Sequence, residues 1–302
     1  MKKKFVLPKA LFTFLEWLGK VSFYNFNRAK NVVYERRIRY CDNPKLYLNV
    51  CYPENARKGA KLPVFVYIHG GGWISGEPEG REAIVSNIAA EGFFTVNIAY
   101  GLAPEYQHPY AIQNIYDAFA WLISNKDKYD IDTDRVYVGG ESAGGYLSAM
   151  VGAISANPEY RDRFDLNPIS KDLKFRGLLL ICGAYELDDA VKSGFPFIKT
   201  FIEAYGGKKV KEILEDPNSD GLSPANFITS GFPPSFIVTG AKDPLRICGV
   251  SLAEKLDKAG VKYILHREEG PFAVHAFLVA QSLPESKRTM PKALEFLKNG
   301  IE

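Results

Sequence analysis

From about residue 45 onward, short apolar runs alternate with longer segments in which apolar residues recur at helical spacing. The run at 46–51 alternates apolar and polar positions, as an antiparallel edge strand does. Later runs are mostly continuous, which is typical of parallel strands that are buried on both faces. They lie at 63–68, 94–100, 135–139, 177–181, 235–240 and 261–265. Helical patterns at 83–90 and 112–122 separate them. The order predicts an α/β fold with a mostly parallel sheet and helices on both faces.

The segment between Ile181 and Ser235 does not fit this alternation. Its roughly 50 residues are too many for one simple crossover. It contains Phe195, Phe197 and Phe201, which indicates an apolar structure of its own. We therefore expect one domain spanning 1–302, with cap elements from about 1–40 and 185–230.

The N-terminal segment shows the spacing of an amphipathic helix. Its repeating apolar positions are Leu11, Leu15, Leu18 and Val21. Charged residues interrupt the stretch, so a signal peptide is not expected. No run of 18 or more apolar residues is present that could span a bilayer. A helix that covers the site or the core is favoured over peripheral contact with a membrane, and the cytoplasm is the expected location.

Composition narrows the class of protein. The chain is 46% hydrophobic, which is enough for a large core, and its net charge of +3 is too small to favour nucleic acid as a partner. The four cysteines are scattered without a Cys-x-x-Cys pair. They are therefore expected to be ordinary thiols, without a metal site or a disulfide framework.

The most specific motif is Gly-Glu-Ser-Ala-Gly at 140–144, between an apolar run and a small-residue helix. Gly-x-Ser-x-Gly in this setting is typical of a nucleophile elbow, a sharp turn that presents the hydroxyl of Ser142 above a sheet. Glycines are needed beside such a turn, where helix and strand come close together. The same five residues could form a turn without chemistry, so the rest of the chain has to decide.

A serine nucleophile needs a histidine base. The chain has four candidates. His275 follows the last predicted strand and is the expected base. His69 directly follows a buried strand and precedes three glycines, which suits a role in shaping a loop. His108 lies in a proline-flanked loop and is expected to be structural or on the surface, and His266 is expected to be exposed.

A carboxylate must orient the base. Asp243 follows the predicted strand at 235–240 and is the candidate, although Asp before Pro is also a common turn signal. The resulting chain order is Ser142, Asp243, His275. This Ser, acid, His order is that of α/β-hydrolases, and it differs from the order in chymotrypsin-like and subtilisin-like enzymes.

Donors for an oxyanion are expected in the loop His-Gly-Gly-Gly at 69–72. We assign the backbone N–H groups of Gly71, Gly72 and Ala143 to this role, with Gly70 shaping the turn. A phosphate-binding loop is the alternative, but neither of the usual glycine spacings is present. The acidic segment 216–221 could indicate calcium, yet it lacks the ligand spacing of an EF-hand, so a solvated turn is expected.

Together these motifs resemble those of the hormone-sensitive-lipase-like esterases, a family of α/β-hydrolases. The resemblance rests on residues 69–73, 100–105, 140–145, 243–245 and 275–277. It implies an α/β-hydrolase fold with a small helical cap, a triad of Ser142, Asp243 and His275, and hydrolysis of short-chain carboxylic esters of small molecules without a cofactor. Two positions depart from the family pattern: Glu141 stands where Asp is common, and no second acid follows Arg246.

Acyl-enzyme chemistry does not fix the leaving group, so an amidase or arylformamidase is an alternative with the same residues. A non-catalytic receptor on the same fold is a further alternative, although it would be expected to lack the nucleophile or the base. We expect Trp73, Tyr185 and the phenylalanines of the cap to line an apolar pocket. A homodimer is left open.

Overall fold

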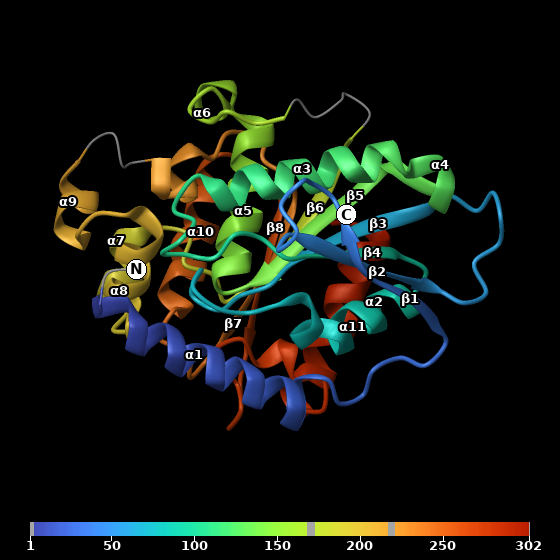
Figure 1. The fold of residues 1–302 in the computed structure, drawn as a ribbon, viewed down its shortest axis with the longest axis horizontal. Coiled ribbons are helices and arrows are strands. Elements are labelled where there is room, and N and C mark those ends of the chain that lie inside the picture. Colours follow the sequence, from blue (N-terminus) through green and yellow to red (C-terminus); the bar gives the residue numbers. More distant parts are fainter. Residues whose placement is uncertain (1–2, 168–172, 217–220, 302) are drawn as a thin grey trace.

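The computed structural model describes residues 3–167, 173–216 and 221–301 (Figure 1). Over these residues, eight strands form one sheet in the order β1-β2-β4-β3-β5-β6-β7-β8. The strands are β1 Val32–Arg39, β2 Tyr47–Pro53, β3 Leu62–Ile68, β4 Phe94–Ile98, β5 Ile131–Glu141, β6 Phe175–Ile181, β7 Ser235–Gly240 and β8 Tyr263–Glu268. Strands β3 to β8 are parallel to one another, which confirms the predicted α/β fold.

The antiparallel part of the sheet contains one more strand than expected. Strand β2 pairs antiparallel with β4, as the alternation at 46–51 predicts, and β1 pairs antiparallel with β2 at the sheet edge. The expected cap range of about 1–40 is therefore too long, because residues 32–39 belong to the sheet. Their pattern did not indicate a strand because this edge is only half buried and its register shifts between Glu35 and Ile38.

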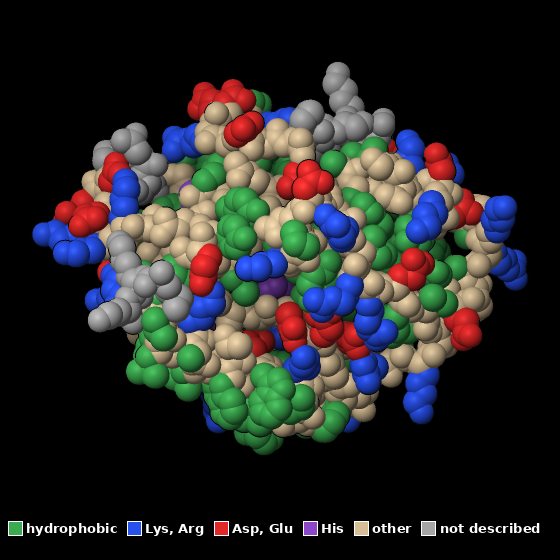
Figure 2. All heavy atoms as spheres, viewed as in Figure 1, with side chains coloured by type: hydrophobic (Ala, Val, Ile, Leu, Met, Phe, Trp, Pro, Cys, Tyr) green, Lys and Arg blue, Asp and Glu red, His purple; other side chains and the backbone are tan. Residues whose placement is uncertain are grey.

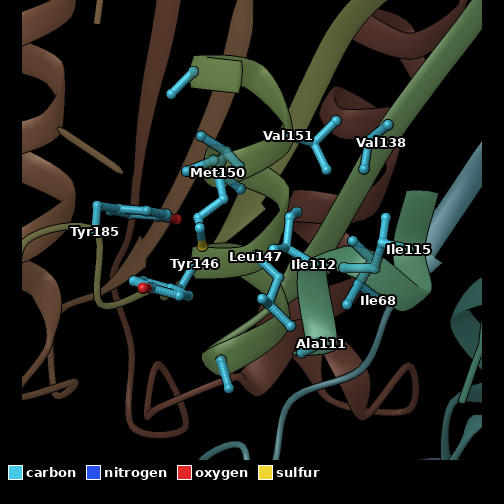
Figure 3. Close-up of a cluster of buried hydrophobic side chains, with 14 of the residues drawn as sticks. Ile68, Ala111, Ile112, Ile115, Val138, Tyr146, Leu147, Met150, Val151 and Tyr185 are labelled. Carbon is cyan, nitrogen blue, oxygen red and sulfur yellow. The ribbon is translucent and has the colours of Figure 1, made fainter. Parts of the chain in front are cut away.

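Helices cover both faces of the sheet, as predicted (Figure 1). Helices α3, α5 and α10 contribute to the hydrophobic core on one face, and α2 and α11 to the core on the other. Their bounds are α2 Glu82–Ala90, α3 Tyr110–Ser124, α5 Ala143–Ala156, α10 Arg246–Lys258 and α11 Pro284–Asn299. The short helices α4 Lys126–Tyr129 and α6 Pro158–Arg161 follow α3 and α5. In Figure 3, side chains of α3 and α5 pack against Ile68 of β3 and Val138 of β5.

Two segments far apart in the sequence meet at the carboxyl ends of the parallel strands. Helix α1 Val6–Gly19, which continues as a π-helix over Lys20–Tyr24, lies beside α8 Ile198–Gly206, which follows α7 Leu187–Lys192 (Figure 1). The ring of Phe12 in α1 packs edge-on against Phe201 in α8, with 4.6 Å between centroids. Helix α9 Val210–Glu215 follows α8.

Short 3-10 turns complete the described chain. They lie at Lys3–Phe5, Pro78–Arg81, Pro224–Phe227 and Phe277–Val279. Of the acidic segment 216–221, for which a solvated turn is predicted, residues 217–220 lie outside the described part of the chain. Among the described helices, none combines the length and the apolar character needed to cross a bilayer.

Candidate active site

Ser142 occupies the sharp turn between β5 and α5. Its backbone angles are φ 55° and ψ −119°, a combination that is strained for a residue with a side chain. Its own N–H donates to the carbonyl of Ile181, at 2.8 Å, which anchors the turn to the neighbouring strand β6. The turn predicted from the motif at 140–144 is present, with the hydroxyl directed to the residues that follow β7 and β8.

The glycines on either side of this turn allow α5 to pack directly on the end of β3. A Cβ atom on Gly140 would lie 2.1 Å from the carbonyl oxygen of Ile68, and one on Gly144 would lie 1.9 Å from the same oxygen. Both distances are far below contact distance, so neither position accepts a side chain without displacement of backbone. The two glycines of the motif are therefore required for the packing of α5 on β3, as well as for the turn that presents the Ser142 hydroxyl.

Ser142, His275 and Asp243 form a continuous hydrogen-bonded chain. The Nε2 atom of His275 lies 2.9 Å from Oγ of Ser142, and its Nδ1 atom lies 3.1 Å from each carboxylate oxygen of Asp243. The carboxylate of Asp243 is almost completely buried and also accepts the N–H of Leu245, at 2.9 Å. With Nδ1–H donated to Asp243, Nε2 is free to accept the serine proton.

The sheet brings these three residues together. Asp243 follows β7 and His275 follows β8, and these two strands are parallel neighbours. The two loops are joined by a backbone hydrogen bond from Lys242 to Ala273, at 2.9 Å. Because the carboxyl ends of parallel strands share one edge of the sheet, residues 133 positions apart in the sequence become hydrogen-bonding partners.

Cys182 lies beneath the triad and was not singled out from the sequence. Its thiol, the carboxylate of Asp243 and the imidazole of His275 place their polar atoms within 4.8 Å of one another, which is close enough to suggest a metal site. However, burial and the neighbouring Asp243 raise the pKa of the Cys182 thiol well above its usual value. A neutral thiol that is hydrogen-bonded to Asp243 is a poor metal ligand. We therefore interpret Cys182 as a residue that helps to hold the Asp243 carboxylate in place, rather than as a metal ligand.

The backbone N–H groups assigned to an oxyanion lie in the glycine loop at 70–72 and at the start of α5. Within the described part of the chain, the N–H groups of Gly71, Gly72 and Ala143 make no hydrogen bond to another protein atom, whereas that of Gly70 donates to Glu141 Oε1, at 2.6 Å. Gly71 and Gly72 have φ values of 110° and 60°, which curl the loop. Ala143 is the first residue of α5, so the positive end of the helix dipole also faces these N–H groups.

The remaining histidines are structural. His69 is buried and stacks on Tyr100, and its Nδ1 lies 2.7 Å from the carbonyl of Gly70. Burial lowers the pKa of His69 to about 4, so the ring is neutral at pH 7, which agrees with its predicted role in shaping the loop. Burial likewise lowers the pKa of His108 to about 4, where the ring contacts the hydroxyl of Tyr205.

His266 differs from its prediction. It was expected to be exposed, but only 12% of its side chain is accessible, and its Nε2 lies near both Glu268 and Thr289. The reason is tertiary: Thr289 belongs to α11, which packs against β8 and covers the histidine.

A pocket of about 190 Å³ adjoins Ser142 and His275. Its walls come from α1, from the segment that contains α8 and from the loops after the strands, and they include Phe12, Leu15, Trp73, Phe195 and Phe201. The predicted lining by Trp73 and by cap phenylalanines is correct for these residues. Tyr185 is wrongly predicted, because it is fully buried beside Met150 and Tyr146 in the core beneath α5 (Figure 3). Its hydroxyl accepts the N–H of Gly183 there.

A larger cavity lies elsewhere. It has a volume of about 670 Å³ and is formed by α10 and the ends of β7 and β8. Its walls carry both signs of charge, and none of Ser142, Asp243 and His275 takes part in it. The smaller pocket is therefore the candidate site, because it alone of the two adjoins the hydrogen-bonded chain.

Arg81, a buried cation at the wall of the smaller pocket, was not identified from the sequence. Its guanidinium lies between Glu141 and Glu16, with ion-pair distances of 2.6 and 2.8 Å. Glu141 was identified only as a departure from the family pattern. An arginine in a polar loop carries no local mark of burial, so the interaction became apparent only from the fold.

The sequence matches known proteins over most of its length. Residues 65–279 match a family model described as alpha/beta hydrolase fold. Carboxylesterase NlhH of Mycobacterium tuberculosis is 30% identical over 274 residues, which cover 88% of this chain and 82% of that protein. Esterase LipC of the same organism is 28% identical over 217 residues, which cover 72% of this chain. The match spans only about half, 53%, of the length of LipC.

Solved structures agree with this result. An esterase from the archaeon Pyrobaculum calidifontis superposes with a TM-score of 0.76 at 27% identity, over 99% of this chain and 91% of that chain. Esterase B from Lactobacillus rhamnosis reaches a TM-score of 0.82 at 22% identity, over 96% and 94% of the two chains, and so shares the fold. With the sheet order and the geometry around Ser142, these matches show that the chain belongs to the α/β-hydrolase esterase family.

Proposed function

We propose that this protein is a serine carboxylesterase that hydrolyses short-chain acyl esters through an acyl-enzyme. The observation that carries the proposal is the hydrogen-bonded chain from Ser142 Oγ through His275 to the buried carboxylate of Asp243. It adjoins an apolar pocket and three free backbone N–H groups. The names of its relatives, among them carboxylesterase NlhH, support the choice of ester as the substrate class.

In the first step, Ser142 Oγ attacks the acyl carbon while His275 Nε2 accepts the hydroxyl proton. Asp243 holds the imidazole in the required tautomer and stabilises its protonated form. The oxyanion of the tetrahedral intermediate accepts hydrogen bonds from the N–H groups of Gly71, Gly72 and Ala143. The C–O bond to the alcohol then breaks, and the alcohol leaves with the proton from His275.

In the second step, water enters where the alcohol left. His275 takes one proton from the water, and the resulting hydroxide oxygen attacks the acyl carbon of the ester on Ser142. The same three N–H groups bind the second oxyanion. The bond to Ser142 Oγ then breaks as His275 returns the proton to it, and the carboxylic acid is released.

The pocket supports a small acyl group. Its volume of about 190 Å³ lies below the roughly 300 Å³ at which pockets for drug-sized ligands begin. Aromatic side chains form much of its wall, including Phe12, Trp73 and Phe201. An acetyl or butyryl chain is accommodated by such a space, whereas a long acyl chain requires α1 or α8 to move.

Further expectations accompany this proposal. We propose that residues 1–31 and 185–230 act as the cap of a single domain over 1–302. The substrate is a small molecule, no cofactor takes part, and the protein acts in the cytoplasm. Contact of α1 with a membrane surface remains a prediction that ranks second to a cap or core role of this helix. Formation of a homodimer is a separate prediction.

The proposal is tested by Ser142→Ala, which removes the nucleophile. We expect hydrolysis of p-nitrophenyl acetate to fall by at least about 10³-fold, because no other group supplies the acyl acceptor. Labelling by a fluorophosphonate probe should disappear as well. Ser155→Ala is the matched control, since Ser155 lies exposed on the same helix, and it should retain both activities. Near-normal turnover by Ser142→Ala would refute the assignment of Ser142 as the nucleophile.

The substrate class is tested with p-nitrophenyl esters from C2 to C12 and with N-formylkynurenine. Highest kcat/KM at C2 to C4 is expected from the small pocket. A preference for long chains contradicts the short-chain proposal. Faster turnover of N-formylkynurenine than of any ester identifies the arylformamidase alternative, and a wild-type protein that neither hydrolyses esters nor reacts with the fluorophosphonate is a receptor.

A further inference from the structure

A buried row of charges links the cap to the nucleophile turn. Arg81, at the end of the 3-10 turn before α2, lies between Glu141 at the end of β5 and Glu16 in α1. Its Nε atom is 2.6 Å from Glu141 Oε1, and its Nη1 atom is 2.8 Å from Glu16 Oε2. The side chains of Arg81 and Glu141 are 2% and 1% exposed, and that of Glu16 is 19% exposed. Charges this deeply buried are retained only with close partners.

The pKa values of Arg81 and Glu16 are both shifted toward the charged form. Burial by itself disfavours the charge on Arg81, but Glu141 and Glu16 keep the pKa of its guanidinium well above the usual value. Burial also opposes ionisation of Glu16, but Arg81 lowers the pKa of this carboxyl below its usual value. The aromatic ring of Tyr24 faces the guanidinium at 5.0 Å. The row is therefore two ion pairs that share one cation.

Glu141 extends this row to the oxyanion loop. Its Oε1 atom accepts the N–H of Gly70, and its Oε2 atom accepts the hydroxyl of Tyr67, both at 2.6 Å. The carbonyl of Gly70 in turn lies 2.7 Å from His69 Nδ1. Because a trans peptide directs its N–H opposite to its carbonyl, the contact with His69 turns the N–H of Gly71 the other way. Glu141 and His69 together set two successive peptide planes, and the second of them carries the N–H of Gly71, the first assigned donor.

Glu16 extends the row in the opposite direction, into the pocket wall. It lies on the same helix as Phe12 and Leu15, and all three residues line the pocket beside Ser142. The position of α1 over the pocket is thus tied to the guanidinium that also orients Glu141. Arg81 also lines this pocket, but among the described residues its charged partners are Glu141 and Glu16. We therefore take its route to the oxyanion donors to run through Glu141 and Gly70.

We propose that Arg81 is a positioning residue that couples the closed position of α1 to the orientation of the oxyanion loop. The inference rests on the proposed esterase function and deepens it. When Glu16 binds Nη1, the guanidinium presents Nε to Glu141, and Glu141 holds Gly70. When Glu16 is lost, Glu141 can pair with Nη1 instead and draw Gly70 away from its position. The cap helix then controls the donors as well as the pocket wall.

The main test is Glu16→Gln, which keeps the size of the side chain and the Arg81–Glu141 pair. Oxyanion donors act mostly in the transition state, so kcat should fall with little change in KM. We expect a loss of about tenfold in kcat for p-nitrophenyl acetate, below the roughly hundredfold loss that follows removal of a donor. Glu77→Gln is the matched control. It removes the ion pair between Glu77 and Lys20, which also joins the α1 region to the segment that leads to Arg81. This variant should keep kcat within about twofold of the wild-type value.

A double-mutant cycle distinguishes coupling from direct contact between Glu16 and the substrate. Arg81→Lys keeps the positive charge but loses the planar fork that spans two carboxylates. If Glu16 acts through Arg81, adding Glu16→Gln to Arg81→Lys should change kcat by less than about twofold. The coupling is overturned if the effects of Glu16→Gln and Arg81→Lys on kcat are fully additive, or if the substitutions change only KM.

Folding is checked by circular dichroism, because breaking a buried ion pair lowers stability. If Arg81→Lys does not fold, Glu16→Asp replaces it in the comparison. A carboxylate at position 16 should then restore part of the kcat that Glu16→Gln loses, and equal kcat in the two variants overturns the inference. Wild-type kcat in Glu16→Gln refutes the coupling alone, whereas activity in Ser142→Ala refutes the esterase proposal, so the two failures are distinguishable.

Discussion

The backbone of Ser142 is held in a strained conformation by residues that have no side chain. Its φ of 55° persists because Gly140 and Gly144 let α5 and β5 press against the carbonyl of Ile68. The hydrogen bond from its N–H to Ile181 contributes on the other side. The backbone conformation of Ser142 and the close packing of α5 on β3 therefore depend on the same two glycines.

Gly144→Ala tests this dependence. The new Cβ would lie 1.9 Å from Ile68 O, so α5 or β3 must shift, and we expect a loss of roughly 2 kcal/mol or more in the free energy of unfolding. The esterase rate should fall with it, because Ser142 moves with α5. Urea unfolding followed by circular dichroism measures the first effect. Gly231→Ala is the control, since its Cβ would meet only ordinary contacts at 3.7 Å, and equal stability of both variants would contradict the packing argument.

At the scale of elements, α1 has two unequal faces. Phe12, Leu15 and Glu16 contribute to the pocket wall, whereas Phe14 and Trp17 are about half exposed. Figure 2 shows hydrophobic side chains gathered along the lower side of the view, where α1 lies. The apolar pattern of the sequence covers both faces, so it predicted the helix but not which residues meet the site.

Two neighbouring phenylalanines separate the faces experimentally. Phe12→Ala removes a ring that packs against Phe201 and lines the pocket, so kcat/KM for p-nitrophenyl butyrate should fall by about tenfold. Phe14→Ala is the matched control and should leave kcat/KM within about twofold, because 55% of Phe14 is exposed to solvent. Steady-state kinetics of both variants decide the matter. Equal losses, or none in Phe12→Ala, would show that α1 is not part of the functional cap.

At the scale of the whole molecule, two buried neutral histidines make stability depend on pH. Burial lowers the pKa values of His69 and His108 to about 4, from 6.5 in an unfolded chain. Between these values the unfolded chain binds more protons than the folded one, so the contribution is fully present above pH 6.5 and is lost as the pH falls toward 4. His69 contacts the carbonyl of Gly70 in the glycine loop at 69–72, and His108 contacts Tyr205 of α8.

We expect the free energy of unfolding to decrease between pH 7.5 and pH 5 by about 2 kcal/mol for each of these histidines. Lowered carboxyl pKa values, such as that of Glu16, affect stability only below about 4.5. The lowered pKa of His266 adds to the decrease, and the raised pKa of Asp117 acts in the opposite direction, so the comparison with a histidine variant identifies the contribution of one ring. Urea unfolding at the two pH values measures the decrease. The variant His108→Asn should show a smaller decrease in the free energy of unfolding over the same pH range. An unfolding midpoint that does not change with pH would contradict the burial of neutral rings.

Much of the fold could be predicted because the central strands carry continuous apolar runs. The pattern located β3 to β8, the nucleophile turn and the two loops after β7 and β8. It missed β1, whose residues are only half buried, and it misplaced Tyr185 and His266. In each case, burial depends on which element packs on the residue, and the local sequence does not record that.

The sequence by itself determined the fold class, the place of Ser142 in a glycine-flanked turn, and the candidates Asp243 and His275 at strand ends. These features depend on near neighbours along the chain, namely apolar spacing, missing Cβ atoms and strand order. Only the tertiary structure decided that Arg81 bridges Glu16 and Glu141, and that one face of α1 lines the pocket. Residues 16, 81 and 141 come within ion-pair distance only in the folded structure, because ion pairs depend on distances in space rather than on spacing in sequence.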